Sequence, residues 1–98
     1  MPQFMVEISL PAFLTQEFIE LIPQQRAFID SVMEKGVITA YMLAIDRSKL
    51  WVTFQAKTPT DVMAVLNAFP IASYIEYTIH ELAFYNSAAA MMPSISLN

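Results

Sequence analysis

The side chains best suited to proton transfer in this sequence alternate along two short apolar segments. His80, the single histidine, follows Glu76 and Thr78 at two-residue spacing, and Glu7 precedes Ser9 at the same spacing. Residues two apart in an extended strand share one face. Imidazole exchanges protons readily near neutral pH, and a partly desolvated carboxylate is the next candidate. His80, Glu7 and Glu76 are therefore the candidate acid–base groups. A packed or hydrogen-bonded interface role would explain His80 more simply, and Glu7 could be satisfied by Ser9, Thr53 or a second subunit.

A second set of alternating residues could bind a ligand. Trp51, Thr53 and Gln55 recur at two-residue spacing in one segment, and Ser9 adds a hydroxyl from another. An indole ring offers stacking area and one N–H donor, while hydroxyl and amide groups supply directional hydrogen bonds. These four residues are the candidate ligand contacts, with core or dimer packing as the simpler role for Trp51.

The composition excludes several kinds of chemistry. The chain has no cysteine, one histidine and one glycine, so we predict no disulfide, thiol nucleophile, metal site, nucleotide-binding loop or cofactor. Five basic residues against nine acidic ones leave no basic stripe for nucleic acid. No apolar run reaches the ~18 residues that a membrane span needs, and no secretory signal is evident, so we expect a cytoplasmic protein.

Residues 37–56 organise the predicted fold, because two β-branched and aromatic runs flank the polar turn from Asp46 to Lys49. With Asp46 as the first turn residue, Leu43 should pair with Val52, and Tyr41 with Phe54. The polar residues of the turn, Arg47 among them, are interpreted as solvated.

Two helices and two further strands complete the pattern. Residues 3–10 and 74–85 alternate as strands. The first helix should begin after Thr15, bend or break at Pro23 and end at Gly36, with Arg26 and Asp30 as an exposed pair. The second should begin at Thr58-Pro59.

The resulting order, βαββαβ, predicts a ferredoxin-like α+β fold: a four-stranded antiparallel sheet, the first and third strands central, with two helices on one face. We expect one domain over residues 1–98, with a core at about 3–85 and a tail at 86–98 that packs on a partner. The uncovered sheet face carries the candidate residues together with apolar side chains. At 56% hydrophobic residues, this surface predicts a homodimer or higher homo-oligomer.

The sequence resembles the muconolactone isomerase-like family of the dimeric α+β barrel superfamily. The resemblance rests on Met33-Glu34-Lys35-Gly36 before the second strand, and on the passage from Leu66 to Ile71 followed by Tyr74 and Ile75. It implies a dimer joined through open sheet faces, sometimes in larger rings, with a ligand cavity between the sheet and the helices or partner. It also implies a cofactor-independent shift of a double bond within an unsaturated lactone.

Two classes of function follow. One is a cofactor-independent isomerase that shifts a proton and double bond in a small unsaturated lactone or acid. The other is a non-catalytic dimer that binds a small ligand or has a structural role. A cavity that brings His80 or Glu7 within hydrogen-bond reach of one ligand position would favour the enzyme.

Overall fold

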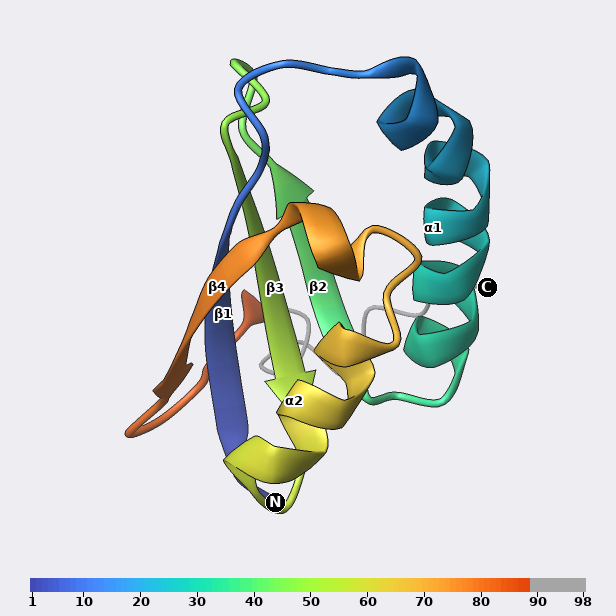
Figure 1. Ribbon diagram of the computed structural model, residues 1–98. Coiled ribbons are helices and arrows are strands. Elements are labelled where there is room, and N and C mark those ends of the chain that lie inside the picture. Colours follow the sequence, from blue (N-terminus) through green and yellow to red (C-terminus); the bar gives the residue numbers. More distant parts are fainter. Residues whose placement is uncertain (89–98) are drawn as a thin grey trace.

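The computed structural model describes residues 1–88, which form a four-stranded antiparallel sheet covered on one face by two helices (Figure 1). The elements in chain order are β1 (Gln3–Ser9), α1 (Gln16–Glu34), β2 (Ile38–Leu43), β3 (Lys49–Gln55), α2 (Pro59–Asn67), a 3-10 turn (Ala72–Tyr74) and β4 (Glu76–Glu81). The predicted ferredoxin-like α+β fold is confirmed.

The strand order is β2-β3-β1-β4, so the first and third strands are central, as predicted. Alternate residues of β1 and β3, among them Phe4, Val6, Val52 and Phe54, are fully buried beneath the helices. The opposite set, which faces away from the helices, forms what we call the outer sheet face. All the candidate residues predicted from the sequence lie on that face.

Helix α1 begins where its capping residue predicts. The Thr15 hydroxyl accepts a hydrogen bond from the Phe18 amide at 3.1 Å. The predicted break at Pro23 is absent, because α1 runs as one element from Gln16 to Glu34. Pro23 and Ile19, whose carbonyl loses its partner, are both exposed, so water can satisfy that carbonyl. Gly36 ends the helix with φ 76°, a conformation that favours glycine.

The last strand is shorter than predicted. The segment that we expected to start a strand at Tyr74 begins instead with the 3-10 turn, and β4 spans only Glu76–Glu81. The second helix is as predicted: Thr58 caps it by accepting from the Asp61 amide, and Pro59 takes its first position. Residues 89–98, most of the predicted tail, lie outside the described residues.

The hairpin register differs from the prediction by two residues. Leu43 pairs with Leu50, and Tyr41 with Val52. The Arg47 amide donates to the Ala44 carbonyl at 2.9 Å, so the turn starts at Ala44 and not at Asp46. A shift of two residues keeps every side chain on its predicted face.

A bulge at Thr39 decides which face of the sheet Ile38 lies on. The pairing passes from Ile38 opposite Phe54 to Ala40 opposite Thr53, which leaves Thr39 as the extra residue of β2. The bulge therefore lets both Ile38 and Tyr41 face the helices although they are three residues apart. Among residues 1–88, no helix is both long and apolar enough to cross a membrane.

Candidate functional site

The outer sheet face brings together part of the predicted site. Glu7 lies between Trp51 on β3 and Thr78 on β4, while Ser9 lies between Lys49 and Glu76. Lys49 Nζ lies 3.3 Å from Glu7 Oε2 and donates to Ser9 Oγ at 2.9 Å. The side chains of Lys49 and Glu7 are 39% and 46% exposed, so solvent screens their attraction. The result is a carboxylate, an ammonium and a hydroxyl in contact, with Glu76 one strand away.

The other predicted residues are further from this cluster or engaged elsewhere. His80 is exposed on edge strand β4, opposite Met5 and not opposite Glu7. Thr53 is buried, and its hydroxyl lies 2.6 Å from that of Thr39. Gln55 accepts a hydrogen bond from Gln3 at 3.2 Å. Within residues 1–88, no group of three or more histidine, aspartate or glutamate side chains is placed to hold a metal ion.

The helix-covered face holds a site that the sequence reasoning did not identify. A pocket of about 140 Å³ opens between α1, the end of the β2–β3 hairpin and the chain after α2. We call it the arginine pocket; its lining residues are Leu10, Ile22, Arg26, Tyr41, Leu43, Arg47, Leu50 and Ile71. Arg26 and Tyr41 also line an adjoining hollow of about 320 Å³ with Asp30. The two spaces therefore have Arg26 and Tyr41 in common.

The two arginines of the arginine pocket are exposed, and the protein does not pair their charges. Neither Arg26 nor Arg47 makes an ion pair or side-chain hydrogen bond within residues 1–88. The pocket thus takes two of the chain's five basic residues and none of its nine acidic ones. Uncompensated guanidinium groups beside apolar walls attract an anion with an apolar body.

Tyr41 provides the hydrogen-bond donor of this site. Burial raises the pKa of its hydroxyl above the usual value near 10.0, although the Gln25 amide and the charge of Arg26 act in the opposite direction. The hydroxyl is therefore protonated at neutral pH. A neutral phenol can donate a hydrogen bond to an oxygen on which negative charge develops.

Gln25 supports this wall from inside the core. It is 4% exposed, and its Oε1 accepts a long hydrogen bond from the Ile71 amide at 3.4 Å. Its Nε2 meets no partner at full hydrogen-bond geometry within residues 1–88, although Gln25 acts on the Tyr41 hydroxyl as a hydrogen-bonding neighbour that lowers its pKa. A buried side-chain amide normally has all its hydrogen bonds formed, so this position is an unusual one in the core.

The sequence contained one signal for this site. The buried stripe of α1 runs through Phe18, Ile22, Ile29 and Val32, and the position between Ile22 and Ile29 that continues the helical spacing is Gln25. A polar residue at a core position of a helix requires an explanation. Arg26, interpreted as one half of an exposed pair, is its neighbour; no ion pair with Asp30 is present among the described residues.

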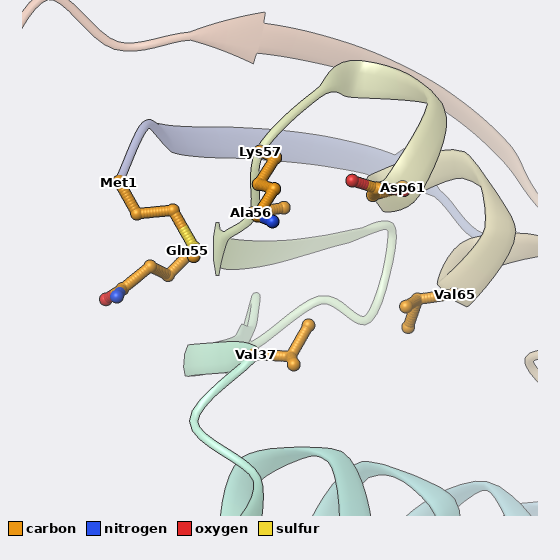
Figure 2. Close-up of a pocket in the computed structure, with 7 residues that line it drawn as sticks. All are labelled: Met1, Val37, Gln55, Ala56, Lys57, Asp61 and Val65. Atoms are coloured by element: carbon orange, nitrogen blue, oxygen red, sulfur yellow. The ribbon is translucent and has the colours of Figure 1, made fainter.

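Another hollow, of about 430 Å³, lies at the opposite end of the sheet (Figure 2). Val37 and Val65 form its apolar part, whereas Lys57 and Asp61 add one charge of each sign. In Figure 2, Met1 and Gln55 lie at its outer edge. The two opposite charges and the open rim favour no particular ligand, so we place the candidate site at the arginine pocket.

Comparisons with solved structures agree with this fold. Two solved structures share the α+β fold of this chain over most of their length. One similar structure is a muconolactone isomerase, with a TM-score of 0.70, 13% identity, and coverage of 88% of this chain and 93% of that one. Another is 5-chloro-2-hydroxyhydroquinone dehydrochlorinase from Burkholderia phenoliruptrix AC1100, in complex with 2,5-dihydroxybenzoquinone. Its TM-score is 0.69, with 12% identity and coverage of 85% of this chain and 95% of that one.

The predicted resemblance is thus confirmed at the level of the fold, which is all that such low identities establish. No protein-family model matches the sequence. No curated protein matches it either.

Proposed function

We propose that this protein is a cofactor-independent isomerase that moves a proton and a double bond within a small unsaturated acid or lactone. The observation that carries the proposal is the arginine pocket, where a protonated Tyr41 and two unpaired guanidinium groups border apolar walls. One enzyme of the same fold is an isomerase of an unsaturated lactone, and another has a small quinone bound. Both names agree with chemistry on small unsaturated rings or chains.

The groups around the pocket have complementary roles in such a reaction. A guanidinium group binds the carboxylate of the substrate, and the Tyr41 hydroxyl donates to the carbonyl oxygen. Asp30, which lines the adjoining hollow with Arg26 and Tyr41, takes the proton from the carbon next to the carbonyl group. The electron pair moves to the carbonyl oxygen, and Asp30 returns the proton to the far end of the conjugated system. Both residues are then restored, and no cofactor is consumed.

A second location for the same chemistry is the outer sheet face. The contact of Lys49 with Glu7 and Ser9 favours it, since a carboxylate base beside an ammonium group could remove a proton and stabilise the enolate. Glu76 and His80 would assist, with Trp51, Thr53 and Gln55 as ligand contacts. Glu7, Glu76 and His80 are exposed on this face in a single chain, so a second subunit would be needed to cover them; we propose a homodimer joined here. Without catalysis, the arginine pocket would make the protein a small-ligand binder.

Proton exchange distinguishes these options. Wild-type protein is incubated in deuterated water with a panel of small unsaturated acids and lactones, and deuterium incorporation is followed by NMR. Asp30→Asn should lower the rate by about 10²–10⁴-fold and Tyr41→Phe by about 10²-fold. Glu7→Gln and His80→Ala should leave it near wild type.

A large loss of rate in Glu7→Gln or His80→Ala, with Asp30→Asn and Tyr41→Phe near wild type, would indicate that the reaction takes place on the outer sheet face. Ligand binding without exchange across the whole panel would instead support the non-catalytic function.

A further inference from the structure

We propose that the ligand of the arginine pocket is a dianion: a small apolar body with one anionic group for Arg26 and another for Arg47. This inference rests on the proposed function and specifies its substrate class as a short unsaturated dicarboxylate. The two arginines come from separate elements, α1 and the β2–β3 turn, and border the same pocket of about 140 Å³. A ligand between these elements therefore meets a positive charge from each of them.

The charges around the pocket favour a ligand with two anionic groups over a ligand with one. Arg26 and Arg47 are both exposed, so a monoanion would pair with one guanidinium group and leave the charge of the other to solvent alone. The pocket itself has no acidic residue, and Asp30 on the adjoining hollow makes no ion pair with Arg26 in the described part of the chain. In a protein of formal charge −4, this concentration of positive charge runs against the overall balance. A dianion compensates both arginines.

The backbone at Arg47 is a separate sign that this side chain has a role. Arg47 has φ 63° and is the one residue other than glycine with a positive φ among residues 1–88. Asparagine and glycine adopt this conformation more readily than arginine does. A strained residue in a turn can persist where function requires its side chain. Here the turn sets Arg47 at the mouth of the pocket.

Gln25 and Tyr41 identify what lies between the two anionic groups. Tyr41 lines the pocket, and the buried Gln25, whose Oε1 accepts from the Ile71 amide, acts on the Tyr41 hydroxyl from the core. The remaining lining is aliphatic, with Ile22, Leu43 and Leu50 among it. An apolar, unsaturated spacer fits these walls, and an oxygen of one carboxylate can accept from Tyr41.

The test compares two ligands that differ in one charge. Binding of trans-hex-3-enedioate and of trans-hex-3-enoate is measured by calorimetry at low salt, because salt screens exposed arginines. We expect the dicarboxylate to bind about 10-fold more tightly, which is the lower end of the effect of one charge-assisted hydrogen bond.

Two variants locate the preference. Arg47→Asn removes the charge but tolerates the left-handed backbone, and Arg26→Gln removes the other charge; each should reduce the ratio of the two dissociation constants to about 1. Lys57→Gln, which removes a positive charge at the opposite end of the sheet, should keep it. Melting temperatures verify that all variants are folded.

The outcomes separate this inference from the proposed function. Equal affinities for the two ligands in wild-type protein would overturn the proposal of a dianionic ligand, but they would not affect the proposal that the protein is an isomerase. A charge preference without proton exchange would support the dianion and overturn the isomerase. If neither ligand binds, the dianion is wrong, and the exchange assay with lactones decides the function independently. A preference that survives in both arginine variants would also overturn the inference.

Discussion

Replacing Arg47 with glycine should stabilise the protein while it removes the preference for a dianionic ligand. A non-glycine residue in the left-handed region costs about 1–2 kcal/mol. About 0.4–1 kcal/mol of the stability gained by removing this strain is lost again, because glycine gives the unfolded chain more conformational freedom. The Arg47 side chain has no ion pair or hydrogen bond to lose in the described part of the chain. The net change in the free energy of unfolding should therefore be a gain of about 0–1.5 kcal/mol, and 1 kcal/mol corresponds to about 4–8 °C in Tm.

Denaturation in urea measures this change, and Ser48→Gly is the matched comparison in the same turn. Ser48 has no positive φ, and its amide and hydroxyl both donate to Asp46 Oδ1, at 2.9 and 2.7 Å. Glycine there should destabilise by about 0.5–1 kcal/mol, because only the entropy cost and the lost hydroxyl remain. If Arg47→Gly destabilised the protein by more than about 0.5 kcal/mol, or by as much as Ser48→Gly, the left-handed backbone at Arg47 would not be strained.

Three further predictions concern the core, the titration of Tyr41 and association. Leu66→Ala should lower the free energy of unfolding by about 2–5 kcal/mol, because Leu66 is fully buried. Met63→Ala, on the exposed side of α2, should change the free energy of unfolding by less than about 0.5 kcal/mol. Equal losses for the two variants in urea denaturation would contradict the packing of α2. Folding raises the pKa of Tyr41, so the folded protein keeps the phenol proton to higher pH than the unfolded chain does. The contribution of Tyr41 to stability is therefore fully present below the usual tyrosine pKa, and it is lost as the pH rises above about 10. Tyr41→Phe should make this alkaline loss shallower, and an unchanged pH profile of stability would show that Tyr41 does not contribute. Thr53→Arg should disrupt the proposed dimer, since Thr53 lies at the centre of the outer sheet face, and an unchanged mass by light scattering would mean that association uses another surface.

The fold was predictable because strong local signals agree with one another. The Thr15 and Thr58 caps, Gly36 after α1 and the alternation in β1 each specify an element, and together they permit few topologies. The exact residue at which the hairpin turn starts depended on weaker signals. The turn could start at either Ala44 or Asp46, since the Asp46 carboxylate is used within the turn in any case. Alternation cannot distinguish such shifts of two residues, because they keep every face.

The candidate site was less predictable, for a geometric reason. Alternation along strands groups residues of one face, so it found Glu7, Ser9 and Trp51, which do lie on the same face. The arginine pocket combines residues from α1, β2 and a turn, and no single periodicity connects them. Alternation did place Tyr41 on the helix-covered face, but it could not connect Tyr41 with residues of α1 or the turn. Only Gln25, a polar residue in the apolar stripe of α1, indicated the site from sequence alone.

A crystal structure with trans-hex-3-enedioate bound would test the location of the site most directly. We expect the ligand between α1 and the β2–β3 turn, with one carboxylate on Arg26, the other on Arg47, and an oxygen within hydrogen-bond reach of the Tyr41 hydroxyl. Electron density for the ligand on the outer sheet face beside Glu7 and Lys49, or in the hollow between Val37 and Val65, would contradict it.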